Sequence, residues 1–110
     1  MYSKMARKQL IRADIKASIY DLGKYLTRFN ELTHSPDMVL LFDSDPRDPS
    51  SRKIYHYRDV TLVDYGRNTP PYPQNFERQT VVGTQEGIED ARQSLESQTG
   101  VKLEAEVIRE

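Results

Sequence analysis

The chain has 110 residues, 16 basic and 17 acidic side chains, no cysteine and a formal net charge of −1. This length accommodates one domain with a single modest core, and the absence of cysteine excludes a disulfide framework, a thiolate nucleophile and a cysteine-based zinc site. No apolar stretch approaches the roughly 20 residues that span a membrane, and no apolar run follows the basic residues 1–8 as it would in a secretion signal, so we expect a cytoplasmic protein without a membrane partner.

The charges are unevenly distributed along the chain. Residues 1–30 carry seven basic and two acidic side chains, and the remainder carries nine basic and fifteen acidic ones. If the helical pattern that follows were extended backwards, Lys4 and Lys8 would fall on its apolar face. We therefore expect residues 1–9 to form a basic N-terminal arm and residues 10–110 to form a single α+β domain.

Residues 10–32 have the strongest helical pattern in the chain. Apolar side chains recur there at spacings of three or four, at Ile11, Ile15, Ile19, Leu22, Leu26 and Phe29. The residue types that dominate the first half have high helix propensity. Because the residue before Pro36 disfavours helical backbone, we expect this helix to end near Thr33.

The first half of this segment also fits a strand. Between residues 11 and 19 the apolar side chains alternate with four polar ones, namely Arg12, Asp14, Lys16 and Ser18. In this alternative, Ser18 and Asp21 would begin a shorter helix as an approximate capping box. Propensity favours the long helix, and the pattern alone leaves residues 8–17 open between helix and strand.

Two strands are predicted in the middle of the chain. Residues 38–42 are a continuous apolar run of strand length, and residues 43–51 form a turn region rich in Asp, Ser and Pro. Residues 53–65 alternate between two faces and are rich in tyrosine and valine. Because thirteen residues is long for a strand, we expect a bend near residues 58–59.

The last third of the chain predicts a loop, a strand, a helix and a final strand. Residues 66–75 are proline-rich and extended, and residues 76–82 fit a strand. Thr84 is a suitable N-cap for the helix that follows, and Gly100 is suited to end it. Residues 101–107 then alternate between apolar and polar side chains as a strand does.

This order predicts an α+β fold. The elements run helix, strand, strand, strand, helix, strand, which corresponds to a four-stranded antiparallel or mixed sheet with both helices packed on one face. A fifth strand is added if residues 11–19 are extended. The nearest familiar shape is a ferredoxin-like plait, whose sheet has two edges that a small domain can cover by forming a dimer.

The leading functional hypothesis is a small, non-catalytic binding or adaptor protein that acts through self-association or a protein partner, most simply as a homodimer. The wide apolar stripe of the first helix and the tyrosines of the long strand exceed what one small core needs. The side chains expected to make the contact are Tyr25, Phe29, Tyr55, Tyr57 and Tyr65.

Nucleic-acid binding is the first alternative. It would use the basic side chains of the N-terminal segment, because lysine and arginine neutralise phosphates in such complexes; these are Lys4, Arg7, Lys8, Arg12 and Lys16. The sequence pI of about 6.1 argues against a dedicated nucleic-acid-binding domain.

A metal-dependent hydrolase is the second alternative. Asp43 and Asp45 follow an apolar strand, where paired carboxylates can hold a hard cation, and Asp48 offers a third ligand. Pro46 instead favours a simple turn after the strand. We expect the two histidines, His34 and His56, to be packing or capping residues, and we expect no cofactor.

Overall fold

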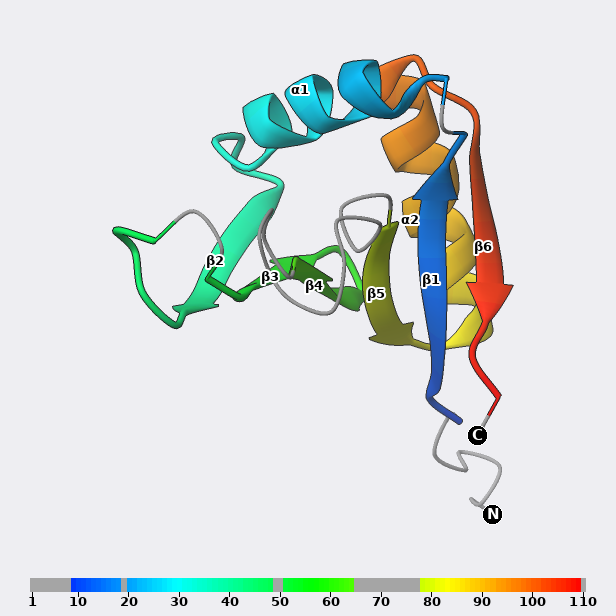
Figure 1. The fold of residues 1–110 in the computed structure, drawn as a ribbon. Coiled ribbons are helices and arrows are strands. Elements are labelled where there is room, and N and C mark those ends of the chain that lie inside the picture. Colours follow the sequence, from blue (N-terminus) through cyan, green and yellow to red (C-terminus); the bar gives the residue numbers. More distant parts are fainter. Residues whose placement is uncertain (1–8, 19, 49–50, 65–77, 110) are drawn as a thin grey trace.

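The computed structural model describes residues 9–18, 20–48, 51–64 and 78–109. Within them the chain forms an α+β fold of six strands and two helices (Figure 1). In chain order these are β1 (Ile11–Ala17), α1 (Leu22–Leu32), β2 (Met38–Asp43), β3 (Lys53–Tyr57), β4 (Val60–Asp64), β5 (Arg78–Gly83), α2 (Gln85–Thr99) and β6 (Leu103–Val107).

All six strands belong to one sheet in the order β2-β3-β4-β5-β1-β6, and each neighbouring pair is antiparallel. The first strand lies between β5 and β6, with Ile15 opposite Gln79 on one side and Ala105 on the other. The two edges of the sheet are β2 and β6, which lie on opposite sides of the molecule (Figure 1).

Both helices cover the same face of this sheet. Tyr55 and Tyr57 are two positions apart on β3, so their side chains point to one face. From α1, the Phe29 ring meets the Tyr55 ring edge to face at a centroid distance of 6.2 Å. From α2, the Ser94 hydroxyl lies 2.6 Å from the Tyr57 hydroxyl. The core therefore lies between this sheet face and the two helices.

Every described element contributes to the core. The buried apolar side chains are Ala13, Ile15, Ala17, Tyr25, Phe29, Met38, Tyr55, Tyr57, Val60, Leu62, Val81, Ile88, Ala91, Leu95, Val101 and Leu103.

The prediction of one long helix over residues 10–32, which propensity favoured, is wrong. The alternative prediction, a strand followed by a shorter helix, is confirmed. Residues Ile11–Ala17 form β1, and the helix begins only at Leu22. The alternating pattern of a strand prevails over the helical pattern because β1 pairs with a strand on each side. On the face away from the core, Asp14 accepts a 2.8 Å hydrogen bond from Thr80 on β5. The capping box of Ser18 and Asp21 does not form, because the N-cap of α1 is Asp21 and it makes no side-chain cap hydrogen bond.

The single long strand over residues 53–65 is also wrong. The chain turns back at the expected bend, so that β3 and β4 form a hairpin in which Tyr57 is opposite Val60. Arg58 takes a left-handed conformation with φ of 56°, which a two-residue turn requires. The sheet consequently has six strands rather than four or five, and Tyr65 lies outside the described residues.

The second helix matches its prediction at both ends. Thr84 is the N-cap, and its hydroxyl accepts a 3.0 Å hydrogen bond from the Gly87 backbone. Gly100 ends the helix in a left-handed conformation with φ of 70°, which glycine adopts without strain. The two ends of α2 are therefore determined by signals that are local in the sequence.

Candidate association surface

The edge strand β2 presents a row of apolar side chains to solvent. Four consecutive residues are about half exposed: Val39 at 51 %, Leu40 at 49 %, Leu41 at 58 % and Phe42 at 45 %. Met38, at the start of the strand, is buried at 5 %. We call these four side chains, together with the outward main chain of β2, the β2 edge surface.

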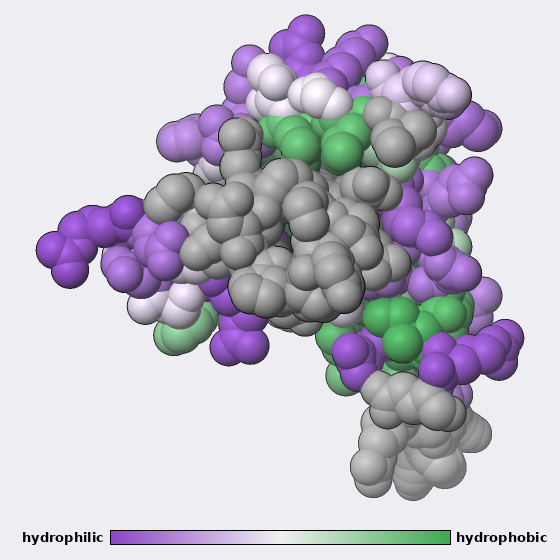
Figure 2. Space-filling model, in the orientation of Figure 1, coloured by the Kyte–Doolittle hydropathy of each residue, from purple (hydrophilic) through white to green (hydrophobic). Residues whose placement is uncertain are grey.

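This row stands out from the rest of the described surface. The other large apolar side chains that are exposed there are isolated in sequence, at Leu10, Tyr20 and Val107. On the face seen in Figure 2, hydrophilic residues cover most of the described surface, and the apolar areas are separate from one another. Single exposed apolar residues are ordinary, whereas a contiguous run indicates a contact surface.

The apolar side chains lie on both faces of the sheet edge. Val39 is opposite His56 and Leu40 is opposite Tyr55, which are on alternate faces of β3. The register then shifts by one residue between Leu40 and Phe42, as in a β-bulge. An added strand would therefore meet apolar side chains above and below the sheet.

No strand among the described residues pairs with the outer side of β2. Within the described residues β2 has one neighbouring strand, β3. In an antiparallel ladder, an edge strand directs about half of its N–H and C=O groups away from the sheet. Proteins commonly protect such an edge with charged side chains, proline or a β-bulge. Residues 38–42 contain no charged residue and no proline, and the register shift between Leu40 and Phe42 is the protective feature that β2 carries.

Charged groups flank the apolar row at the end of β2. Asp43 Oδ1 accepts a 2.7 Å hydrogen bond from the Ser51 hydroxyl, and Lys53 Nζ lies 3.8 Å from Asp43 Oδ2. The Arg52 guanidinium lies over the Phe42 ring, 5.8 Å from its centroid. Asp43 is thus neutralised within the protein, and Arg52 is exposed beside Phe42.

The aromatic side chains expected to contact a partner lie in the core instead. Tyr25, Phe29, Tyr55 and Tyr57 are at most 6 % exposed, because the two helices cover the sheet face that carries these tyrosines. Tyr65 lies outside the described residues. The candidate contact surface in the structure is therefore the edge strand β2, and not these aromatic rings.

The expected nucleic-acid set is only partly described. Lys4, Arg7 and Lys8 lie outside the described residues. Arg12 and Lys16 are on β1, and Lys16 Nζ lies 2.6 Å from Glu106 Oε1. Acidic side chains thus accompany the basic ones on this part of the sheet, and nothing here favours a polyanion over a protein.

The three aspartates of the expected metal site do not form one. Among the residues that the structure describes, no group of three or more His, Asp or Glu side chains could hold a metal ion. Asp45 Oδ1 accepts a 3.1 Å hydrogen bond from the Arg47 backbone, and Asp48 N donates to Asp45 O at 3.0 Å. These contacts, together with those of Asp43, are those of a polar turn after a strand.

An acidic depression lies beside α2. Its volume is about 850 Å³, and Glu86, Glu89 and Asp90 are among its lining residues. Two of these acids already have basic partners: Glu89 binds Arg92, and Asp90 lies 3.5 Å from Arg58. The depression therefore offers little unpaired charge to a ligand.

No family model, curated protein or solved structure matches the chain. In the described part of the chain, neither helix has the length and apolar character needed to cross a bilayer. The candidate surface accordingly rests on the geometry of β2.

Proposed function

We propose that this protein is a small, non-catalytic association module that acts by accepting an added strand at the β2 edge surface. The observation that carries this proposal is the run of four half-exposed apolar side chains on an edge strand, Val39 to Phe42. In strand addition, main-chain hydrogen bonds supply affinity and alternate side chains supply specificity. The proposal covers a partner protein and a second copy alike, and we place its action in the cytoplasm.

We further propose that β4, β5, β1 and β6, with the two helices, correspond to a ferredoxin-like plait. On this interpretation β2 and β3 are an added hairpin that extends the sheet away from α2. Figure 1 supports this interpretation, because β2 lies far from α2 and beyond the strands that α2 covers. Within this hairpin, β3 packs under the helices through Tyr55 and Tyr57, whereas β2 contributes only Met38 to the core. The outer strand β2 is therefore a natural place for an interaction edge.

The test is fluorescence-detected sedimentation of the labelled chain in a concentrated extract of its source cells. We expect it to sediment faster than a 12.8 kDa monomer, and we expect Leu41→Lys to restore the monomer rate, because a charge on an edge strand opposes strand addition. Val107→Lys is the matched control, since Val107 is a 47 %-exposed apolar residue on the opposite edge strand, β6.

Two results would contradict the proposal. The wild-type chain could sediment as a monomer in the extract, or Leu41→Lys could sediment as fast as the wild type. Far-ultraviolet circular dichroism of the purified variants verifies that both substitutions leave the fold intact.

A further inference from the structure

We infer that the strand added to the β2 edge surface belongs to a second copy of this chain, so that two sheets join in one continuous sheet across a two-fold axis. This inference rests on the proposed function and names its partner. In a two-fold interface the same patch of both subunits must complement itself. The edge of a strand meets this condition, because an antiparallel copy presents acceptors to its donors and donors to its acceptors.

The apolar side chains are placed symmetrically for such pairing. Because the register shift lies between Leu40 and Phe42, Val39 and Phe42 are on the same face of the sheet. An axis between Leu40 and Leu41 therefore places Val39 of one copy opposite Phe42 of the other. Leu40 and Leu41 of both copies then lie beside the axis, so the four exposed apolar side chains of each copy come together.

The area is sufficient for a modest dimer. Four large apolar side chains that are each about half exposed present on the order of 350 Å² of apolar surface per copy, within the range of functional patches on monomers. Two copies would cover roughly twice that, before the main chain and flanking polar groups are counted. This apolar area alone lies below the roughly 1,200 Å² of the smaller specific interfaces, so we expect a weak, reversible dimer.

The experiment is sedimentation equilibrium of the purified full chain over micromolar to submillimolar concentrations. We expect a monomer–dimer equilibrium for the wild type and for Val107→Lys. Leu41→Lys places two lysines beside the axis, and we expect it to weaken dimerisation by roughly 100-fold or more. A monomeric wild type throughout this range, or an unchanged dimer of the Leu41→Lys variant, would overturn the inference.

Cysteine cross-linking supplies an independent readout, because the natural chain has no cysteine. Leu41→Cys lies beside the proposed axis, and we expect mild oxidation to join two copies rapidly. Val107→Cys, on the far edge, is expected to cross-link only at the slow rate of random collision. Equal rates for the two variants would count against the β2 axis.

The result also separates this inference from the proposed function. If the purified chain is monomeric while the labelled chain in extract still forms a complex that depends on Leu41, the partner is another protein and only the homodimer fails. If the labelled chain shows no Leu41-dependent complex in extract either, both fail.

Discussion

The Tyr25 hydroxyl donates a 2.6 Å hydrogen bond to Gln79 Oε1, and this bond joins α1 to β5. Both residues are almost completely buried, at 0 % and 1 % exposure. The surrounding core is apolar, so neither group has easy access to water as an alternative partner. A buried polar pair of this kind fixes the position of a helix over a sheet more specifically than apolar packing does.

Removing the donor of this bond is expected to destabilise the fold. Tyr25→Phe keeps the ring but leaves Gln79 Oε1 without its hydroxyl, which costs about 1–3 kcal/mol when an acceptor is buried. Tyr20→Phe makes the same chemical change at a side chain that is 95 % exposed, and we expect it to alter stability by less than about 0.5 kcal/mol. Urea denaturation measures both, and equal losses would show that the buried bond has no special role.

The same tyrosine predicts a dependence on alkaline pH. Burial, and to a lesser extent the charge of Asp64, raise the pKa of Tyr25 above its ordinary value of 10.0. The folded state therefore keeps the proton longer than the unfolded state does. The stabilisation is fully present below pH 10 and is lost as the pH rises through the folded pKa. The advantage of the wild type over Tyr25→Phe should shrink progressively as the pH rises above 10.0, and a constant difference would contradict this.

How far the sequence predicts the fold depends on whether local or long-range contacts decide each element. The second helix was predictable because Thr84 and Gly100 signal its ends through their own conformations. The apolar residues of the segment Ile11–Ala17 fit both the helical and the strand periodicity. Its pairing with β5 and β6 prevails over its helix propensity. The hairpin turn at Arg58 carries no glycine or asparagine, so only a bend was predictable.

The candidate surface was predictable only as a strand. The apolar run at residues 38–42 indicates extended structure, but a continuous apolar run is equally typical of a central, buried strand. Its place at the edge follows from the order of the six strands, which depends on contacts between distant residues. The tyrosines of β3 were misassigned for a related reason, since alternation cannot show which face the helices cover.

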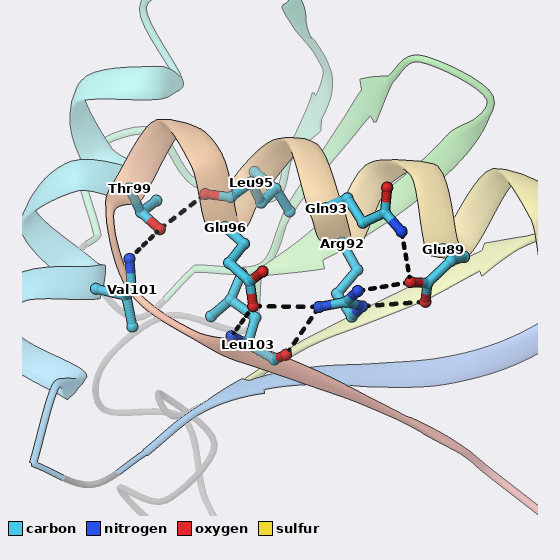
Figure 3. A network of polar contacts seen from close by, with 8 residues as sticks. All are labelled: Glu89, Arg92, Gln93, Leu95, Glu96, Thr99, Val101 and Leu103. Carbon is cyan, nitrogen blue, oxygen red and sulfur yellow. Dashed lines mark hydrogen bonds and ion pairs between the residues drawn. The ribbon is translucent and has the colours of Figure 1, made fainter.

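Arg92 ties α2 to β6 and is expected to stabilise the fold (Figure 3). Its guanidinium lies 2.5 Å from Glu89 Oε2 and 3.2 Å from Glu96 Oε2, and it donates a 3.1 Å hydrogen bond to Leu103 O. Glu96 in turn accepts a 2.8 Å bond from Leu103 N. Because this side chain is only 18 % exposed, we expect Arg92→Ala to cost about 1–3 kcal/mol, as measured by urea denaturation.

A matched control for Arg92 lies on the first helix. Arg28 pairs with Glu31, three residues later in the sequence, but the Arg28 side chain is 53 % exposed. An exposed pair of this type contributes about 0.2–0.5 kcal/mol, so Arg28→Ala should be nearly neutral. Amide hydrogen exchange at β6 should accelerate only in Arg92→Ala. If both variants lose the same stability, the bond to Leu103 contributes nothing beyond a surface ion pair.

Glu89 predicts a loss of stability in acid. Hydrogen bonds from Arg92, and then from Gln93, lower the pKa of Glu89 from its ordinary value of 4.5 to about 2. Its stabilising contribution is therefore present above pH 4.5 and disappears as the pH falls towards 2. Solvent screening keeps this contribution small, because half of the side chain is exposed. The wild type should be more stable than Glu89→Gln at neutral pH, and the difference should narrow in this window.

An NMR titration of the Glu89 carboxyl tests the cause directly. In the wild type its midpoint should lie near pH 2, and in Arg92→Ala it should move towards 4.5, since the principal hydrogen-bond donor is gone. Denaturation of Glu89→Gln in the Arg92→Ala background should then show a weaker dependence on acid than in the wild-type background. A midpoint that stays low without Arg92 would assign the shift to Gln93, and the bond between Arg92 and Glu89 would no longer account for it.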